Sequence, residues 1–239
     1  MHSSVAVDSL EILVIVDNVT DSLSTNPPWV EPEWRGLLNR GRIRVLSGPG
    51  MFSRRGTTLP SGIVFPMAPV PTQEELVSAG ANVICTDEPQ FVGQGFFYVS
   101  GEIPRVTPYE KGLVNQVRRL HDGADWEPDP LVLDERYVSV NIKGRGQFIF
   151  SACSHAGIIN VLKHARKTFS QVPPFAIMGG LHLSGLTEAI IPETIADMEQ
   201  FGLQIFAPGH CTGWRAISAM QRTFKDKVVP LAVGKRFLV

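Results

Sequence analysis

The second half of the chain alternates short apolar runs with segments of helical periodicity. The runs GQFIF, FAIMGG and LQIFAPG predict buried strands. The segments AGIINVLKHARK, PETIADMEQFG and TGWRAISAMQRTF place apolar residues three or four positions apart and predict amphipathic helices. This alternation indicates layers of helices and strands, an α/β fold.

The first half is rich in predicted strands but less regular. LEILVIVDN (residues 10–18), NVICT, GFFYVSG and RYVSVNIKG predict strands, and the closing segment VVPLAVGKRFLV is expected to be extended. TQEELVSAGA predicts a short helix with Thr72 as its N-cap and Gly80 as its stop, and EPEWRGLLNR a further short helix. The segment Gly144 to Gly146 is expected to be a hairpin turn.

Three of the predicted strands in the second half run into small residues and then a histidine. FIFSACSHAG contains His155, AIMGGLHLSG contains His182 and IFAPGHCTGW contains His210. The carboxyl ends of strands in α/β sheets form the edge where ligands bind. Three imidazoles are a sufficient protein ligand set for a catalytic zinc. The pattern therefore leaves two interpretations equally open, a shared metal site and three separate turn histidines.

Three cysteines, Cys85, Cys153 and Cys211, lie far apart, and their odd number argues against a disulfide framework. We expect free thiols in a reducing compartment. Cys153 and Cys211 flank two of the histidines and could be ligands or nucleophiles, but small buried packing residues are the favoured interpretation.

Composition and charge exclude several classes of function. The 239 residues are 44% hydrophobic and 19% charged, and the formal net charge is -1. This near-neutral charge balance does not indicate a nucleic-acid partner. The first apolar run is interrupted by Asp17, so we expect neither a membrane span nor a secretory leader, and a cytoplasmic protein.

At these motifs the chain resembles a known family. GQFIFSACSHAGIINVLKHA, AIMGGLHLSG and APGHCTGWRA, in this order, are similar to the C-terminal half of the metallo-β-lactamase fold superfamily. The most similar branch is named for 7,8-dihydropterin-6-methyl-4-(β-D-ribofuranosyl)-aminobenzene 5'-phosphate synthase. ILVIVDN and VSGEIPRVTPYE also resemble that branch.

The resemblance implies an αββα sandwich with a two-metal centre, usually zinc, at one edge of the two sheets. By position, His155 would ligate the first metal and His210 the second. His182 stands where other branches have a bridging aspartate. The loop SGEIPR would border the active site, so Arg105 could bind a substrate carboxylate or phosphate, with a structural salt bridge as the equal alternative.

One part of the family pattern is missing. The signature His-x-His-x-Asp-His does not occur in the sequence. Gly48-Pro49-Gly50 lies where the surrounding segments join directly, which predicts a deletion seam near residues 41–55. We therefore expect a single domain over 1–239 that is truncated in its N-terminal half and binds one zinc ion or none, since the signature supplies most of the ligands.

Two classes of function follow from these observations. The first is a metal-dependent hydrolase or group transferase acting on a small anionic molecule, impaired by the missing motif or rebuilt with the three histidines around one metal. The alternative is an inactive degenerate or alternatively spliced member that acts through a protein partner or self-association at an exposed sheet edge. The acidic segment DWEPDPLVLDER is expected to be a solvated loop rather than a site.

Overall fold

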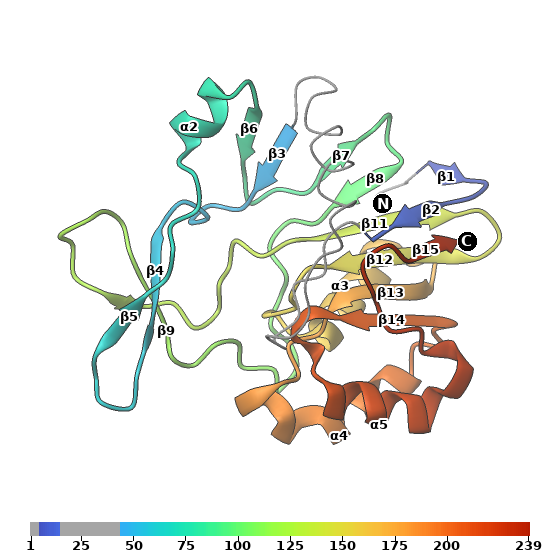
Figure 1. Ribbon diagram of the computed structural model, residues 1–239. Coiled ribbons are helices and arrows are strands. Elements are labelled where there is room, and N and C mark those ends of the chain that lie inside the picture. The colour runs from blue at the N-terminus through green and yellow to red at the C-terminus, as the bar shows by residue number, and fades with distance from the viewer. Residues whose placement is uncertain (1–4, 15–43) are drawn as a thin grey trace.

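A seven-stranded mixed sheet forms the centre of the computed structural model, which describes residues 5–14 and 44–239 (Figure 1). Its strand order is β14-β13-β12-β11-β8-β7, and β1 pairs with β11. The strands are β1 (Ala6–Val7), β7 (Gln90–Val92), β8 (Phe97–Val99), β11 (Tyr137–Ile142), β12 (Gly146–Ser151), β13 (Pro174–Gly180) and β14 (Ile205–Gly209). The predicted end of the first strand at Asp17, the helix at 31–40 and the start of the seam at 41–43 lie outside the described residues.

The direction of pairing changes in the middle of this sheet. Strands β11 and β12 form an antiparallel hairpin in which Ile142 faces Gly146, so the expected turn at residues 144–146 is confirmed. Strands β12, β13 and β14 are parallel neighbours. Parallel strands need crossovers, and helices supply them here. The carboxyl ends of these three strands therefore lie along one edge.

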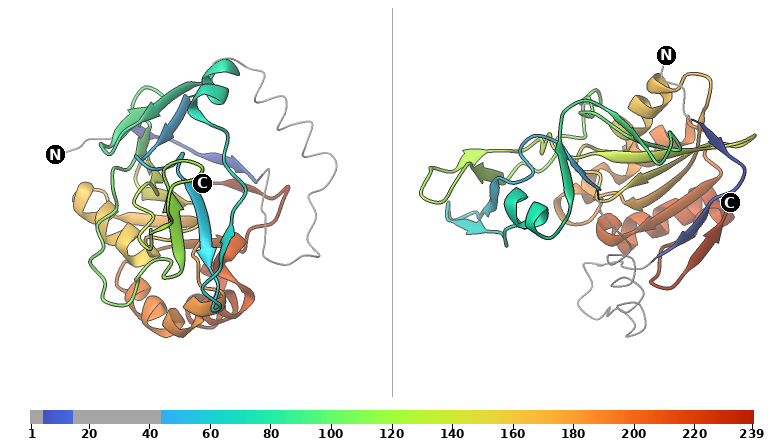
Figure 2. Two further views of the ribbon diagram at one scale, coloured as in Figure 1. Left: turned by 90° about the vertical axis from the view of Figure 1, so that its left-hand side faces the viewer. Right: turned by 90° about the horizontal axis from the view of Figure 1, so that it is seen from above.

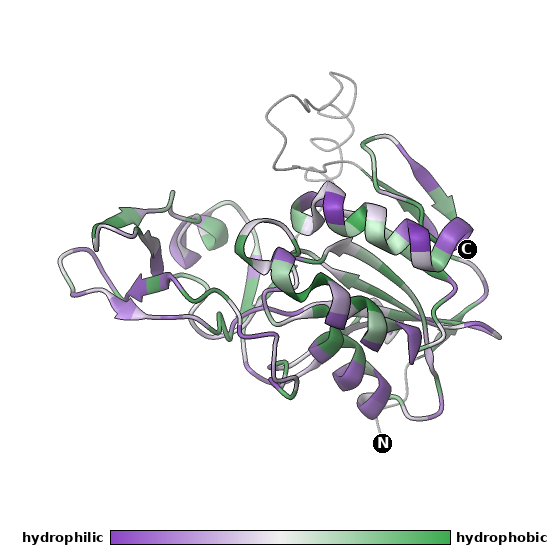
Figure 3. Ribbon diagram, turned by 90° about the horizontal axis from the view of Figure 1, so that it is seen from below, coloured by the Kyte–Doolittle hydropathy of each residue, from purple (hydrophilic) through white to green (hydrophobic). Residues whose placement is uncertain are grey.

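Three helices cover one face of the sheet, as Figure 3 shows. They are α3 (Ile158–Thr168), α4 (Ile191–Glu199) and α5 (Trp214–Phe224), each close to its predicted bounds. Their apolar faces and the facing strand residues form the larger core, which includes Tyr98, Tyr137, Ile149, Leu162 and Met198. The apolar helix faces that the periodicity of the sequence predicts are thus buried.

The opposite face carries a second, smaller layer. Strand β2 (Glu11–Leu13) pairs antiparallel with β15 (Arg236–Leu238), and the two lie across the sheet from the helices (Figure 2). The smaller core between these layers includes Phe148, Met178 and Phe237. The outer edge of β14 is partly covered, because the Val229 N–H donates to the Phe206 carbonyl (2.8 Å).

A smaller β-structure projects from one end of the main sheet, and of its elements only α2 and β6 were predicted from the sequence. It contains a sheet of order β10-β9-β4-β5, a parallel pair β3-β6 and the helix α2 (Figure 1). The bounds are β3 (Arg44–Ser47), β4 (Arg54–Thr58), β5 (Val64–Pro66), α2 (Gln73–Ser78), β6 (Asn82–Cys85), β9 (Gln116–Arg119) and β10 (Glu127–Pro128). Strands β4 and β9 are short and rich in arginine, so neither apolar alternation nor a buried run marked them.

The predicted start of helix α2 at Thr72 is confirmed. The Thr72 hydroxyl accepts from the Glu75 N–H (3.1 Å), and the Glu75 carboxylate accepts from the Thr72 N–H (2.7 Å). This reciprocal pair is a capping box, which satisfies two backbone donors at the helix start.

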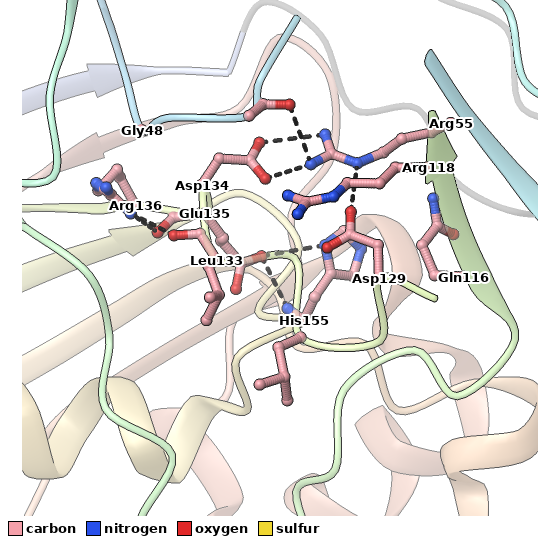
Figure 4. A network of polar contacts seen from close by, with 12 residues as sticks. Gly48, Arg55, Gln116, Arg118, Asp129, Leu133, Asp134, Glu135, Arg136 and His155 are labelled. Carbon is pink, nitrogen blue, oxygen red and sulfur yellow. Dashed lines mark hydrogen bonds and ion pairs between the residues drawn. The ribbon is translucent and has the colours of Figure 1, made fainter. Parts of the chain in front are cut away.

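The projecting sheet is fastened to the main body by ion pairs of Arg55 on β4, drawn in Figure 4. Its Nε donates to Asp129 at 3.1 Å, and its Nη1 and Nη2 both reach the Asp134 carboxylate. The expectation that segment 125–136 is a solvated loop fails at Asp129, which is buried, whereas Asp125, Glu127 and Leu133 are exposed. These carboxylates are held inside because a guanidinium compensates them.

Residues 48–53 of the predicted seam form a packed turn between β3 and β4. A Cβ atom on Gly48 would lie 2.5 Å from Arg136 Nη2 and 2.6 Å from the Asp134 Cα, so the backbone there sits tightly against segment 134–136. Only glycine fits such a close approach.

Arg55→Met should lower the free energy of unfolding by about 3 kcal/mol, since two largely buried carboxylates would lose their compensating charge. The comparison is Arg236→Met, which removes an exposed pair with Glu11 and should cost less than about 1 kcal/mol. Urea denaturation of the three proteins measures both values. Equal stability of the Arg55 variant and the wild type would contradict this account of how the small sheet is attached.

Candidate metal centre

Three histidines follow the carboxyl ends of three neighbouring parallel strands. Strand β12 ends at Ser151, four residues before His155; β13 ends at Gly180, two before His182; and β14 ends at Gly209, directly before His210. Since the strands are adjacent and parallel, the structure places the three histidines along one edge of the sheet. This is the arrangement that the strand-end pattern predicts.

The side chains at this edge form two groups that share Cys153. The rings of His155 and His182 are 4.8 Å apart between centroids and meet edge to face. Potential ligand atoms of Cys153, His155 and His182 all lie within 4.8 Å of one another. The same holds for Cys153, His210 and Cys211. The two cysteines, 58 positions apart in sequence, bring their Sγ atoms to 2.9 Å.

The two thiols of this pair titrate together. The hydrogen bond from Cys153 lowers the pKa of Cys211, and His182 and His210 lower it further, whereas burial opposes the shift. The same hydrogen bond raises the pKa of Cys153. One thiol proton is therefore released more readily than from an ordinary cysteine, and the second is retained.

The backbone at this edge adopts conformations that side chains rarely take. Ser154, His182 and His210 have φ angles of 56°, 48° and 49°. Half of the six non-glycine residues with positive φ in the described part of the chain are thus gathered here. Such residues cost energy and persist where the surroundings hold them, which is typical of functional sites.

Glu135 holds the segment that carries His155. Its carboxylate accepts from the backbone N–H groups of His155 (2.8 Å) and Ala156 (2.6 Å) and lies 3.3 Å from His155 Nδ1, as Figure 4 shows. Burial raises the pKa of Glu135, but the His155 ring and the two N–H groups outweigh burial and bring it below its ordinary value. With Nδ1 engaged, Nε2 is the nitrogen of His155 left for a metal.

A second carboxylate, Glu110, caps the start of α3. It accepts from the N–H groups of Ile159 and Asn160, each at 2.9 Å, and from the Thr107 hydroxyl at 2.8 Å. An anion suits the amino end of a helix, where backbone donors have no partner within the helix. Gly157 has a φ of 90°, and a side chain there would collide with Glu110.

A pocket of about 500 Å³ opens beside the histidines. His155 and His182 line it, whereas Cys153, His210 and Cys211 do not. Apolar side chains form much of its wall, and Lys111 is the lysine that lines it. The apolar lining residues are Met67, Leu113, Val114, Leu181, Leu183, Leu186 and Ile190. The pocket is large enough for a metabolite-sized molecule.

Arg105, the predicted substrate-binding residue, is not among the residues that line this pocket. Its Nη1 donates to the Ile103 carbonyl at 2.9 Å, and its Nη2 donates to the Leu131 carbonyl. In this structure Arg105 therefore ties its own loop to segment 131–134.

Neither of the two glutamates that support the site was predicted from the sequence. Glu110 follows the motif Thr107-x-x-Glu110, which resembles a capping box, but the helix that it caps begins 48 residues later in the chain, at Ile158. Glu135 belongs to an acidic segment whose spacing suggested only solvent exposure. Neither partnership leaves a local signal, because each joins segments that are distant in sequence.

Comparisons with known proteins agree with the fold and the motifs. No family model matches the chain. A solved metal-dependent hydrolase of the β-lactamase superfamily superposes with a TM-score of 0.75 at 16% identity, over 95% of this chain and 98% of that one. The protein therefore has the metallo-β-lactamase fold.

The branch is indicated by sequence. The chain is 25% identical, over 81% of its length, to the 7,8-dihydropterin-6-methyl-4-(β-D-ribofuranosyl)-aminobenzene-5'-phosphate synthase of Methanocaldococcus jannaschii. It is 27% identical over 62% of its length to an uncharacterized protein of the same organism. The chain spans 65% and 52% of these two curated relatives. In sequence, the chain is thus similar to the branch that is named for this synthase.

The donor atoms at the sheet edge fit the class of metal that this superfamily uses. Imidazole nitrogens and thiol sulfurs, which make up both groups of potential ligands in the described residues, are ligands that zinc prefers. Within those residues, no helix combines the length and the apolar character needed to cross a membrane.

Glu135→Ala should lower the free energy of unfolding by about 2 to 4 kcal/mol, because the His155 and Ala156 N–H groups would lose their acceptor. It should also change the tautomer of His155, which nitrogen-resolved NMR of the imidazole detects. Glu127→Ala, which removes an exposed pair with Arg118, serves as the comparison and should leave both quantities nearly unchanged. An unchanged His155 spectrum in the Glu135 variant would contradict the positioning role.

Proposed function

We propose that the protein is a metal-dependent hydrolase or group transferase acting on a small anionic molecule, with His155, His182 and His210 among the ligands of its metal. The observation that carries this proposal is the convergence of these histidines on one sheet edge, beside a pocket, in a metallo-β-lactamase fold. A metal bound here would act as a Lewis acid and lower the pKa of a bound water.

Other residues of the chain position the site and exclude water from it. Glu135 fixes His155 through its backbone and its Nδ1. Glu110 fixes the start of α3, and with it the wall of the pocket. The apolar wall excludes water from the body of a substrate, and excluding water strengthens electrostatic interactions at the reacting end.

The pocket supports an anionic substrate. Lys111 is exposed at the pocket, and no salt bridge compensates it among the ion pairs of the described residues. Its ammonium would attract a phosphate or a carboxylate. The similar synthase is named for a 5'-phosphate, which agrees with this chemistry. We infer a small amphipathic substrate whose apolar part lies against Leu181, Leu183 and Leu186.

His155→Ala and His210→Ala should each reduce bound zinc to below about one tenth of the wild-type content, since a site that loses one of a few ligands loses most of its affinity. His121→Ala, an exposed loop residue, is the control and should retain full metal content. Metal analysis of the purified, monodisperse proteins measures this. A folded wild-type protein without metal would instead support an inactive member of the family that acts through a partner.

Lys111→Gln should raise the KM for an anionic substrate about tenfold with little change in kcat, because the lysine contributes binding rather than chemistry. The substrate comes from a screen of phosphate and carboxylate esters with the zinc-loaded protein. Lys143→Gln, at an exposed lysine paired with Asp8, is the matched control. A fall in kcat with unchanged KM in the Lys111 variant would contradict this assignment.

A further inference from the structure

We propose that Cys153 and Cys211 are themselves metal ligands, so that the centre is a mixed sulfur–imidazole site and not an all-imidazole site. This inference rests on the proposed function and deepens it, because it assigns ligands that the strand-end histidines do not account for and selects the class of metal.

The grouping of ligand atoms supports this assignment. Among the described residues, every group of three close enough to share an ion contains Cys153, and none consists of the three histidines alone. His155 and His182 belong to one group and His210 to the other, with Cys153 common to both. The Cys153 sulfur is therefore the atom through which all three histidines become parts of one centre.

The spacing of the donor atoms is close to that of a metal site. Tetrahedral zinc, with bonds of about 2.0 to 2.3 Å, has ligand atoms about 3.3 to 3.8 Å apart. Cys153 Sγ lies 3.9 Å from His182 Nδ1 and 2.9 Å from Cys211 Sγ. Side-chain shifts of less than about 1 Å would bring both distances into this range.

The surrounding backbone makes room for the sulfurs. A Cβ atom on Gly180 would lie 2.8 Å from Cys211 Sγ and 2.6 Å from the Ala152 carbonyl oxygen. Cys211 is buried and its Sγ also contacts the Cys153 carbonyl at 3.4 Å. Cys85, by contrast, is exposed, and its Sγ contacts the Gly48 carbonyl and no histidine. Cys85 is thus a surface thiol of the same chain with which the thiols of the site can be compared.

Sulfur ligands would also supply metal-binding atoms in place of those that the missing signature provides in the family. The two thiols raise each group of potential ligands to three, the number that protein ligands commonly supply in catalytic zinc sites. Each thiol gives up its proton to solvent when the metal binds, and the resulting thiolate neutralises part of the metal charge. Soft sulfur donors favour zinc over manganese or magnesium.

Cobalt(II) tests the proposal, because a thiolate ligand produces a sulfur-to-cobalt charge-transfer band in the near ultraviolet that imidazole ligands do not. We expect this band when the metal-free full chain, purified under reducing conditions, is titrated with cobalt. Cys153→Ser and Cys211→Ser should each weaken or abolish the band and lower zinc affinity about 100-fold or more, whereas Cys85→Ser should leave both unchanged.

A second measurement does not depend on how the variants fold. In the wild-type protein, zinc should slow alkylation of Cys153 and Cys211 and leave Cys85 unaffected, as mass spectrometry of the labelled peptides would show. Cobalt binding without the charge-transfer band, or no zinc protection of the two thiols, would overturn the sulfur assignment and leave the proposed function standing. Failure of the folded protein to bind either metal would overturn both.

Discussion

Parallel pairing of β12, β13 and β14 is the constraint on which the candidate site depends. It brings three chain segments to one edge with their carboxyl ends aligned, and each segment must then turn away within a few residues. The turns require small residues and unusual backbone: a side chain on Gly179 would collide with the Ser151 carbonyl, and His182 and His210 both adopt positive φ. The geometry of the histidines is thus a consequence of backbone packing.

Around this edge, buried carboxylates from loops that are distant in sequence hold the backbone of the site in place. Glu110 binds N–H groups in the first turn of α3, where the helix dipole favours an anion, and Glu135 binds the His155 and Ala156 N–H groups just before this helix. Asp134, next to Glu135, binds Arg55 of the projecting sheet. One short stretch of chain therefore joins the small sheet on one side to the segment of His155 on the other, as the contacts in Figure 4 show.

The chemistry of the site differs from what a resemblance to the superfamily alone would imply. The sequence lacks the motif that contributes most of the family's metal ligands, yet the sheet edge still gathers five donor side chains, two of which are thiols. A metal bound by this donor set would act as a Lewis acid, and the thiols would favour a thiophilic ion. The pocket beside it, with an apolar wall and Lys111, has the properties expected for a small amphipathic anion.

The sequence by itself determined the elements whose signals are local. The helices of the second half, the strands β12 to β14, the capping box of α2 and the strand-end positions of His155, His182 and His210 all follow from periodicity or from a few neighbouring residues. Only the tertiary structure decided which distant groups meet. Cys153 meets Cys211, Glu110 meets Asn160 of α3 and Arg55 meets Asp129, pairs that are separated by 58, 50 and 74 positions. Such pairs depend on strand order and loop path, which leave no periodic trace in the chain. Arg105 likewise makes a contact that no local pattern indicates, because its guanidinium donates to the distant Leu131 carbonyl.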